Sequence, residues 1–385
     1  MESTLEQSIS TGKRQQMIKV TRGPELSVVV PTFNESENVP ALVDRLRSVL
    51  RDQNWEVVFV DDDSPDGTAD VIRAIGQRDS RVRCVQRIGR RGLSSACIEG
   101  MLASSAPYVA VMDADLQHDE TLLPKMLETL KREDLDAVVG SRYVNGGGIG
   151  DWSKRRASLS RVARLLSGLV VKANLTDPMS GFFMIQRRTL NAAVKNLSGI
   201  GFKILVDLFA SSPHALRFRE LPYEFRTRQA GESKLDSQVE WDYLMLLVDK
   251  LIGRFVPVRF LSFAMIGGSG VIVHLAVVWA LFRGYDVSFV ASQTAATLVA
   301  MVYNYSLNNL LTYRDRRLRG WRWLSGLFSF TLACSVGAFA NVGISSYVFR
   351  QDSGWALAAL VGVIVSSVWN YAVTSVYTWN RPKAA

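Results

Sequence analysis

Cysteine is scarce in this chain of 385 residues, which contains only Cys84, Cys97 and Cys334. None of the three has a metal-type partner at short spacing, and together they give no disulfide framework. We therefore expect reduced thiols in a protein core or against lipid, and no catalytic thiol.

Long apolar runs are missing before residue 240. Residues 1–24 are polar and contain no apolar signal-peptide core, so we expect a loose tail there. After about residue 257 the composition changes, and four segments have the roughly 20 apolar residues that a bilayer-crossing helix requires. We expect an all-α transmembrane domain of four helices, with spans at 258–282, 288–313, 323–349 and 355–379.

Positive charge is concentrated between these apolar segments rather than spread over the chain. The net charge is +9, and the loop between the second and third expected spans is rich in arginine, whereas the loops "RGYDVS" and "RQDSG" hold one arginine each. This asymmetry is typical of a loop on the cytoplasmic side. We expect a multi-pass protein of the cell or inner membrane, with both termini and the large N-terminal domain in the cytoplasm and no nucleic acid partner. The arginines of the basic loop are Arg314, Arg316, Arg317, Arg319 and Arg322.

Residues 25–142 alternate apolar strand-like runs with amphipathic helical patterns. Continuous apolar strands separated by helices predict an α/β, Rossmann-like domain with a mostly parallel sheet that is covered on both faces. Such sheets bind ligands beyond the carboxyl ends of their strands. Polar clusters follow the expected strands at 31–35, 61–68, 113–118 and 140–143, so one site is predicted at that edge.

Glycine-rich phosphate loops are also absent. The chain has no G-x-x-x-x-G-K-[ST] motif and no G-x-G-x-x-G after the first expected strand. A nucleotide in this site would need another means of neutralising its phosphates, and a divalent cation held by oxygen ligands provides one. Asp113, Asp115 and Gln117 would project to one side if the strand stays extended, and they are candidate ligands for Mg²⁺ or Mn²⁺.

These acidic residues also have simpler interpretations. Asp115 or Asp119 could cap the helix expected from about residue 120, whereas Asp113, beside a buried strand, needs a partner. Residues 66–68 fit a turn and a helix cap. Residues 61–63 are three adjacent aspartates that repel one another unless they contact donors, and a ribose or base edge would supply donors.

Several motifs in order carry a family resemblance: "PTFNESENV", "VDDDSPDGT", "MDADLQH", "GSRYVNGG", "DPMSGFF", "GFKIL" and "RQAGESKL". Over about residues 25–236 the chain resembles the polyprenol- (dolichol-) phosphate mannosyltransferases, which are family 2 glycosyltransferases of the GT-A fold. The expected spans resemble the GtrA-type module that follows the catalytic domain in some members. The Q-x-x-R-W signature of processive polysaccharide synthases is missing. The resemblance implies a GDP-mannose donor, a lipid-phosphate acceptor and a divalent metal.

The resemblance also implies roles for individual residues. Nucleotide contacts would come from Pro31, Phe33, Glu35, Val60 and Asp62. Phe33 stands where the family more often has tyrosine, so stacking is kept and a hydroxyl contact is lost. Asp113, Asp115 and Gln117 would hold the metal, with the backbone of Ala114 near the donor. The residues expected to face phosphates are Arg142, Arg156, Lys203, Arg228 and Lys234, and the catalytic set is Asp115, Arg142, Arg228, Lys234 and Arg156.

Basic and amphipathic segments border this domain. Residues 152–166 form a basic amphipathic pattern that is either a solvated face or a headgroup contact, and we favour headgroups for Lys154, Arg155 and Arg161. Residues 228–234 are typical of a mobile phosphate clamp. Residues 237–257 predict an interfacial amphipathic helix, or alternatively a helix packed on the domain. The expected boundaries are 1–24, 25–236, 237–257 and 258–382.

The expected membrane domain contains an internal repeat. Residues 261–282 align with 328–349, and 304–314 align with 370–380. Each copy is one helix hairpin, so an axis along the membrane normal should relate them. Asn304 and Asn308 share a helix face, as do Asn370 and Thr374. Such polar residues in a membrane serve either function or interhelical hydrogen bonding.

These observations predict an inverting, metal-dependent transfer of mannose from GDP-mannose to dolichyl or polyprenyl phosphate. The alternatives are a polyprenyl-phosphate glucosyltransferase that uses UDP-glucose, and a glycolipid flippase whose soluble domain is a sensor. A phosphate monoester has a second pKa of about 6 and is largely a dianion at pH 7. We therefore expect no general base for the acceptor.

Overall fold

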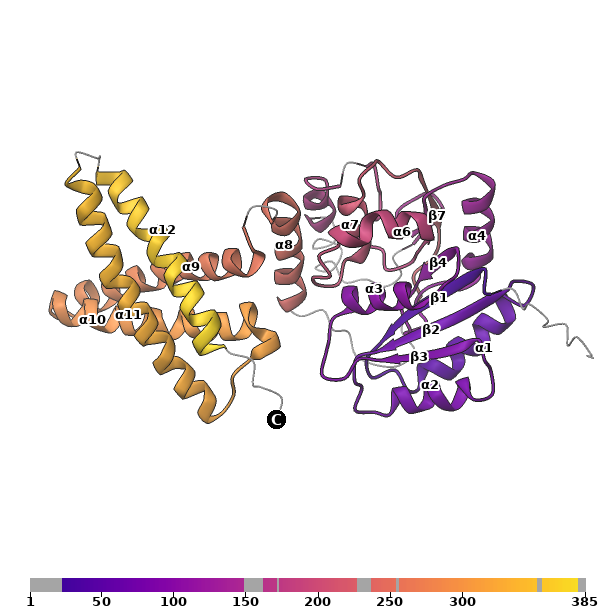
Figure 1. The fold of residues 1–385 in the computed structure, drawn as a ribbon, viewed down its shortest axis with the longest axis horizontal. Helices are drawn as coiled ribbons and strands as arrows, with labels where there is room; N and C mark the ends of the chain where they lie inside the picture. Colours follow the sequence, from indigo (N-terminus) through magenta and orange to yellow (C-terminus); the bar gives the residue numbers. More distant parts are fainter. Residues whose placement is uncertain are drawn as a thin grey trace, which may run out of the picture.

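The computed structural model describes residues 23–148, 162–171, 173–226, 237–253, 256–351 and 355–379. Arg156, Arg228 and Lys234 lie outside these ranges, as do the expected headgroup residues Lys154, Arg155 and Arg161 and the whole of the expected phosphate clamp. Figure 1 shows an α/β domain and a helical domain, with α8 (Ser237–Ile252) next to both.

The α/β domain is built on a seven-stranded sheet in the described part of the chain, with the order β3-β2-β1-β4-β6-β5-β7. β6 pairs antiparallel with both β4 and β5, and the other pairs are parallel, so the mostly parallel sheet is confirmed. The first five strands follow the expected apolar runs, whereas β6 and β7 were not expected. The strands are β1 (Leu26–Thr32), β2 (Trp55–Asp61), β3 (Val82–Gln86), β4 (Tyr108–Val111), β5 (Ala137–Ser141), β6 (Phe183–Gln186) and β7 (Phe218–Pro222).

Side chains of the central strands alternate between two cores, one on each face of the sheet. Val28 and Val30 pack in one core with residues of α1, α2 and α4, while Val29 packs in the other with residues of α3, α6, α7 and α8. Successive side chains point to opposite faces, and both faces are buried. The strands are therefore continuous apolar runs in the sequence. The helices are α1 (Asn38–Val49), α2 (Thr68–Gly76), α3 (Leu93–Ala103), α4 (Leu122–Arg132), α6 (Arg187–Ala193) and α7 (Ile204–Ser211).

Helix α8 packs on the α/β domain, which is the alternative to a purely interfacial helix. Leu246 and Leu247 are buried in the second core, and the Tyr243 hydroxyl donates to the Ala163 carbonyl at 2.6 Å. Lys250 of α8 pairs with the buried Asp207 of α7 at 2.6 Å. At the end of α8, Leu251 and Ile252 stay exposed and remain available for membrane contact.

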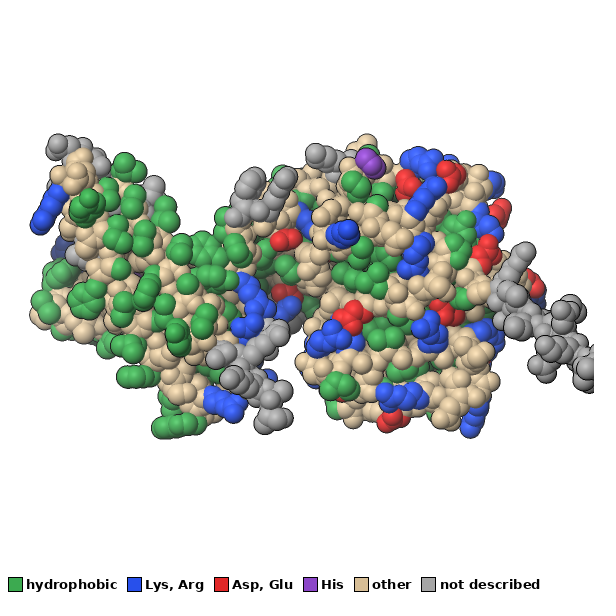
Figure 2. Space-filling model, viewed as in Figure 1, with side chains coloured by type: hydrophobic (Ala, Val, Ile, Leu, Met, Phe, Trp, Pro, Cys, Tyr) green, Lys and Arg blue, Asp and Glu red, His purple; other side chains and the backbone are tan. Residues whose placement is uncertain are grey.

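The helical domain contains helices close to the expected spans. Two of them, Val258–Gly284 and Trp321–Val348, are long and apolar enough to cross a membrane by length and composition. Hydrophobic side chains cover the visible face of this domain, whereas charged side chains are spread over the α/β domain (Figure 2). The helices are α9 (Val258–Trp279), α10 (Phe289–Leu307), α11 (Trp321–Phe349) and α12 (Trp355–Val373), and π-helical turns extend α9, α10 and α12.

The two helix hairpins, α9–α10 and α11–α12, make the same contacts. Ser262 hydrogen-bonds Thr312 at 2.7 Å, and the equivalent Ser329 hydrogen-bonds Thr378 at 3.0 Å. Tyr313 and its equivalent Trp379 stack on each other, with ring centroids 4.1 Å apart. The aligned sequences therefore correspond to matching contacts.

Two asparagines show how closely the hairpin helices approach. A Cβ added to Gly270 would lie 2.2 Å from Asn304 Oδ1, and one added to Gly337 would lie 2.1 Å from Asn370 Oδ1. Both amide oxygens are buried without a hydrogen-bond partner within the described residues. The expected shared faces are confirmed, because Asn308 donates to the Asn304 carbonyl and Thr374 donates to the Asn370 carbonyl. The asparagine oxygens pack against glycine instead of forming an interhelical hydrogen bond.

Candidate active site

The strand pairings bring the carboxyl ends of β1, β2, β4 and β5 to one edge of the sheet. The polar clusters predicted at 31–35, 61–68, 113–118 and 140–143 therefore follow strands that end at the same edge. This is the position where open α/β sheets bind ligands.

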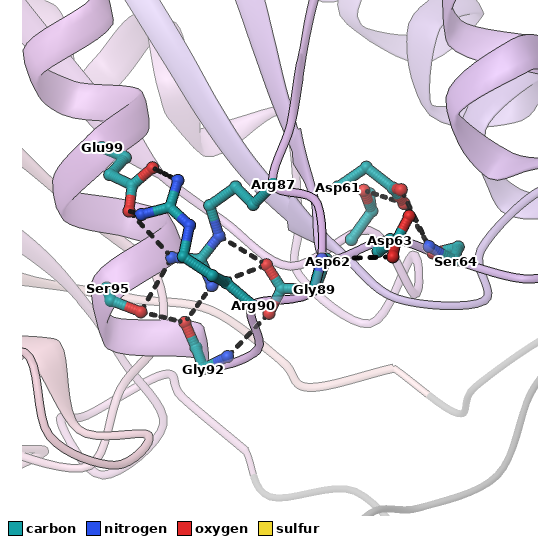
Figure 3. Close-up of polar contacts among 11 residues, drawn as sticks. Asp61, Asp62, Asp63, Ser64, Arg87, Gly89, Arg90, Gly92, Ser95 and Glu99 are labelled. Atoms are coloured by element: carbon teal, nitrogen blue, oxygen red, sulfur yellow. Dashed lines mark hydrogen bonds and ion pairs between the residues drawn. The ribbon is translucent and has the colours of Figure 1, made fainter. Parts of the chain in front are cut away.

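Asp61, Asp62 and Asp63 receive their hydrogen bonds from the protein (Figure 3). Asp61 accepts from the backbone N–H and hydroxyl of Ser64. Asp63 has a φ of 56° and accepts from Gln86 and from the Gly89 N–H, both at 3.2 Å. The donors that three adjacent acids require therefore come from the chain itself, and not only from a ribose or base edge as expected.

Arg87, which the sequence reasoning missed, is the central cation of this cluster. Its side chain is 1% exposed, and its Nε donates to Asp62 Oδ1 at 2.7 Å. Its other nitrogens donate to the Ser95 hydroxyl and the Gly92 carbonyl. The Gly92 N–H donates to the second oxygen of Asp62 at 2.7 Å. The sequence carried no clear signal for it, because β3 is an edge strand with only Val82 buried, so the burial of Arg87 depends on the loop that follows.

Burial raises the pKa of Asp62, and the Gly92 N–H and the Arg87 guanidinium oppose that rise. With both oxygens bonded within the protein, Asp62 shapes the loop after β3 in this structure. Its nucleotide contact stays a prediction.

The residues after β1 are placed around the same edge. Phe33 lies under the Arg91 guanidinium, which is 4.1 Å from the ring centroid. Glu35 accepts a hydrogen bond from the Asn38 amide at 2.7 Å, and its N–H donates to Thr68. Pro31 is half-buried in β1, and Val60 is fully buried in β2. Asp66 accepts from the N–H of Thr68 at 3.1 Å, as expected for a turn that begins α2.

The candidate metal loop turns away from the strand. β4 ends at Val111 and Leu116 has a φ of 61°, so the condition that the strand stays extended through 113–117 is not met. Asp115 is 5% exposed and accepts from the Gln117 N–H at 3.2 Å. The Gln117 amide nitrogen donates to the Arg226 carbonyl at 3.0 Å. Asp119 accepts from Thr121 at the start of α4, which supports its capping role.

The donor set of this loop suits a hard cation. Among the described residues no group of three His, Cys, Asp or Glu side chains is placed to hold a metal, so the candidate set depends on the Gln117 amide oxygen. The Gln117 amide nitrogen donates a hydrogen bond to the Arg226 carbonyl, which leaves the amide oxygen as the metal-ligating atom. Two carboxylates and one amide oxygen are the ligand types that Mg²⁺ and Mn²⁺ prefer. The three residues therefore fit the metal.

His118 contacts the backbone of the candidate metal loop, and it was not among the site residues predicted from the sequence. Its Nδ1 accepts the Asp113 backbone N–H at 3.1 Å, and its Nε2 is 3.8 Å from Asp113 Oδ2. The ring stacks on Phe182 at 5.2 Å and touches the edges of Tyr223 and Phe225. Desolvation by these neighbours lowers the pKa of His118 to about 4. A neutral imidazole therefore fixes the backbone of the first candidate ligand.

Arg142 is paired inside the protein. Its Nε and Nη2 donate to the two oxygens of Asp177 at 2.7 and 2.8 Å, and its backbone N–H donates at 3.1 Å. Asp177 is fully buried and Arg142 is 8% exposed. Burial alone would lower the pKa of Arg142, but the Asp177 carboxylate more than reverses this and raises it. The guanidinium fork expected to face a phosphate therefore holds the "DPMSGFF" segment.

The remaining expected residues are only partly placed. Lys203 is half-buried at the start of α7, and Ala114 is buried in the metal loop. Gly181 of the "DPMSGFF" segment approaches the metal loop closely, because a Cβ there would lie 3.3 Å from Asp113 Oδ2. Arg156, Arg228 and Lys234 fall outside the described residues.

Two family models match the chain. Glycosyl transferase family 2 matches residues 27–192, and the GtrA/DPMS transmembrane domain matches residues 262–379. A dolichol-phosphate mannosyltransferase of Pyrococcus furiosus is 31% identical over 92% of this chain and 99% of its own length. Proteins of the same name from Mycosarcoma maydis and Saccharomyces cerevisiae are 37% and 36% identical over 63% and 60% of this chain, and 85% and 88% of their own lengths. A solved glucosyl-3-phosphoglycerate synthase of Mycobacterium tuberculosis is 20% identical over 59% of this chain and 80% of its own, with a TM-score of 0.43.

Proposed function

The chain belongs to the dolichol-phosphate mannosyltransferases of glycosyl transferase family 2, and on that premise we propose that it uses GDP-mannose as donor and inverts the configuration at the anomeric carbon of the sugar. It is a glycosyltransferase that transfers mannose to dolichol phosphate. The similarity covers both domains, which favours a transferase over a flippase with a sensor domain.

The observation that carries the proposal of a metal-bound nucleotide diphosphate donor is the oxygen-rich loop at the sheet edge. Asp113, Asp115 and Gln117 would hold Mg²⁺ or Mn²⁺, which would stabilise the charge on the leaving diphosphate. His118 fixes the Asp113 backbone, and the Arg226 carbonyl orients the Gln117 amide. These contacts keep the candidate ligands in place before a donor arrives, as preorganised electrostatic stabilisation requires.

The acceptor needs cations rather than a base. A phosphate dianion can attack the sugar directly, but it must approach a negatively charged donor. Lys203, Arg156, Arg228 and Lys234 are the proposed neutralising groups, because guanidinium and ammonium groups bind phosphate well. Arg142 has a different proposed role, since its fork holds Asp177 and so supports the segment against the metal loop.

The membrane arrangement is part of the proposal. The chain is a membrane protein, and we place α9, α10, α11 and α12 across the bilayer with both termini in the cytoplasm. Arg314 of the basic loop pairs with Asp242 of α8, so this loop and the catalytic domain lie on the same side. That contact supports placing the loop and the catalytic domain on one face of the bilayer, and the charge count supports the cytoplasmic face. It also supports grouping α8 with the catalytic unit.

The test is transfer by the full chain in membranes. Labelled GDP-mannose, UDP-glucose and other nucleotide sugars are offered with dolichyl phosphate, and label is counted in extracted lipid. GDP-mannose alone should label the lipid in the presence of Mg²⁺ or Mn²⁺. Labelling from UDP-glucose in its place would overturn the donor assignment, and full labelling in excess EDTA would overturn the metal.

A further inference from the structure

A cavity of about 370 Å³ opens at the basic loop of the helical domain, between the end of α10 and the start of α11. Its lining includes the basic residues Arg317 and Arg319 together with Asn309, Leu310 and Trp323. It is far along the chain from the catalytic edge, and none of the roles assigned above uses it.

The loop beside the cavity is held in one shape. Asn309 is 3% exposed, and its amide donates to the Leu318 carbonyl at 3.1 Å while accepting the Leu318 N–H at 2.8 Å. The Trp379 indole N–H also donates to Asn309, at 3.1 Å. Arg316 donates to the Trp379 carbonyl at 3.2 Å. The arginines on either side of Leu318 are thus carried by a fixed backbone.

The arginines of this loop differ in their partners. Arg314 pairs with Asp242 and Arg316 bonds Trp379, whereas Arg317, Arg319 and Arg322 are exposed and pair with no carboxylate among the described residues. Several exposed arginines of the catalytic domain do have such partners. Arg188 and Arg217, for example, both pair with Asp134.

We propose that this cavity binds the phosphate headgroup of an anionic membrane phospholipid. Arg317 and Arg319 would bind the phosphate oxygens, for which guanidinium offers paired donors. Leu310 and Trp323 would contact the glycerol region and the start of an acyl chain, as aromatic residues do at membrane interfaces. Basic pockets between transmembrane helices on the cytoplasmic side recognise such headgroups.

The preference of arginine-rich loops for the cytoplasmic side does not explain the cavity or the fixed backbone of this loop. It requires arginines in a cytoplasmic loop, but it requires neither a cavity beside them nor a buried asparagine that fixes the loop backbone. The acceptor phosphate is also a poor occupant, because it must reach the edge of the catalytic sheet. The inference does not depend on which sugar donor the enzyme uses.

The experiment uses the full chain in detergent, titrated with phosphatidylglycerol or phosphatidylcholine, and counts bound lipid by native mass spectrometry. The test variant is Arg317→Lys/Arg319→Lys, which keeps the charge and so the orientation. The matched control is Arg283→Lys/Arg350→Lys, which changes exposed arginines of the other two loops. Arg317→Gln/Arg319→Gln removes the charge as well.

Phosphatidylglycerol should bind the unaltered chain more tightly than phosphatidylcholine does. The lysine variant should bind phosphatidylglycerol about fivefold more weakly, because the paired, charge-assisted hydrogen bonds of the guanidinium groups are lost. The glutamine variant should bind it about tenfold more weakly or worse, because the attraction of the positive charges is lost as well. The control should bind as the unaltered chain does. Equal binding by the lysine variant and the control would overturn the proposal in favour of unspecific attraction. Saturation by dolichyl phosphate with no response to phosphatidylglycerol would overturn it in favour of an acceptor site.

Discussion

In the catalytic domain two buried arginines meet carboxylates as charged pairs, whereas in the helical domain a neutral hydroxyl pair occurs twice. Arg87 joins Asp62, and Arg142 joins Asp177, across long stretches of sequence. Ser262 with Thr312 is repeated by Ser329 with Thr378. Charged pairs can fix the loops around a site that binds charged substrates. Neutral pairs can join helices within a bilayer, where an unpaired charge is costly.

The largest expected effect tests whether the charges of the catalytic edge perform chemistry. Asp115→Ala should reduce mannose transfer by at least about a thousandfold, since the loss of a preorganised electrostatic group costs several kcal/mol in the transition state. Transfer is measured with labelled donor at several Mn²⁺ concentrations. Asp70→Ala, in an exposed pair with Arg73, is the control and should stay near normal. Recovery of Asp115→Ala at high donor concentration would argue against a metal role.

The next largest effect tests whether Arg142 stabilises the folded protein through its pair with Asp177. Arg142→Ala leaves the buried Asp177 carboxylate unpaired and should lower the free energy of unfolding by about 3–5 kcal/mol. Arg142→Met/Asp177→Leu should recover most of this loss, because both charges are then removed. Urea unfolding of the full chain in micelles, followed by circular dichroism, measures both variants. A stable Arg142→Ala protein that binds donor but fails to transfer would restore the phosphate role instead.

A pH effect should come from His118. The folded protein holds the ring neutral with a pKa of about 4, whereas the unfolded chain protonates it near the ordinary value of 6.5. Protons therefore favour unfolding. Its contribution to stability is complete above pH 6.5 and is lost as the pH falls from 6.5 toward 4, by about 2 kcal/mol between pH 7 and 5.

His118→Phe should be less stable at pH 7 but should lose less stability between pH 7 and 5. His214→Gln changes an exposed histidine and should keep the pH dependence of the unaltered chain. Urea unfolding at the two pH values measures all three proteins. An unchanged pH dependence in His118→Phe would show that other groups cause it.

The smallest expected effect tests the equivalence of the two hairpins. Gly270→Ala and Gly337→Ala each place a methyl group on an asparagine oxygen, and each should cost about 1–2 kcal/mol after the gain in helix propensity. The two costs should be similar. Thermal unfolding in the same detergent compares them with Gly267→Ala, where an added Cβ meets nothing within 4 Å. Strongly unequal costs would mean that the contacts differ in strength.

Local pattern predicted what depends on local sequence. The first five strands, α1 to α4 and the four apolar helices were all predicted, because their burial follows a continuous apolar run or, in α1 to α4, the 3.6-residue period of an amphipathic helix. β6 and β7 were missed: β6 is a four-residue strand whose place is set by its antiparallel pairing with β4 and β5, and β7 has the sequence "FRELP" with two charges and a proline. An edge strand of this kind has no apolar alternation to reveal it.

The site was harder to predict because its contacts come from distant segments. Arg142 was assigned to a phosphate because Asp177 lies 35 residues away in the chain. Asp62 was assigned to a ligand because its partners Arg87 and Gly92 lie 25 and 30 residues away in the chain. The residue types at the edge were predictable, whereas their internal partners depended on the fold.

The stack of Tyr313 on Trp379 has a consequence for how the helical domain can change. A residue on a two-fold axis meets its own copy, and these two residues occupy equivalent positions and meet each other. Such an interface is isologous, so two separate copies of one hairpin could assemble it as a symmetric dimer. Fusing the copies places no demand on the connecting segment except its length. That segment is then free to diverge, and it is the one that carries the arginine-lined cavity.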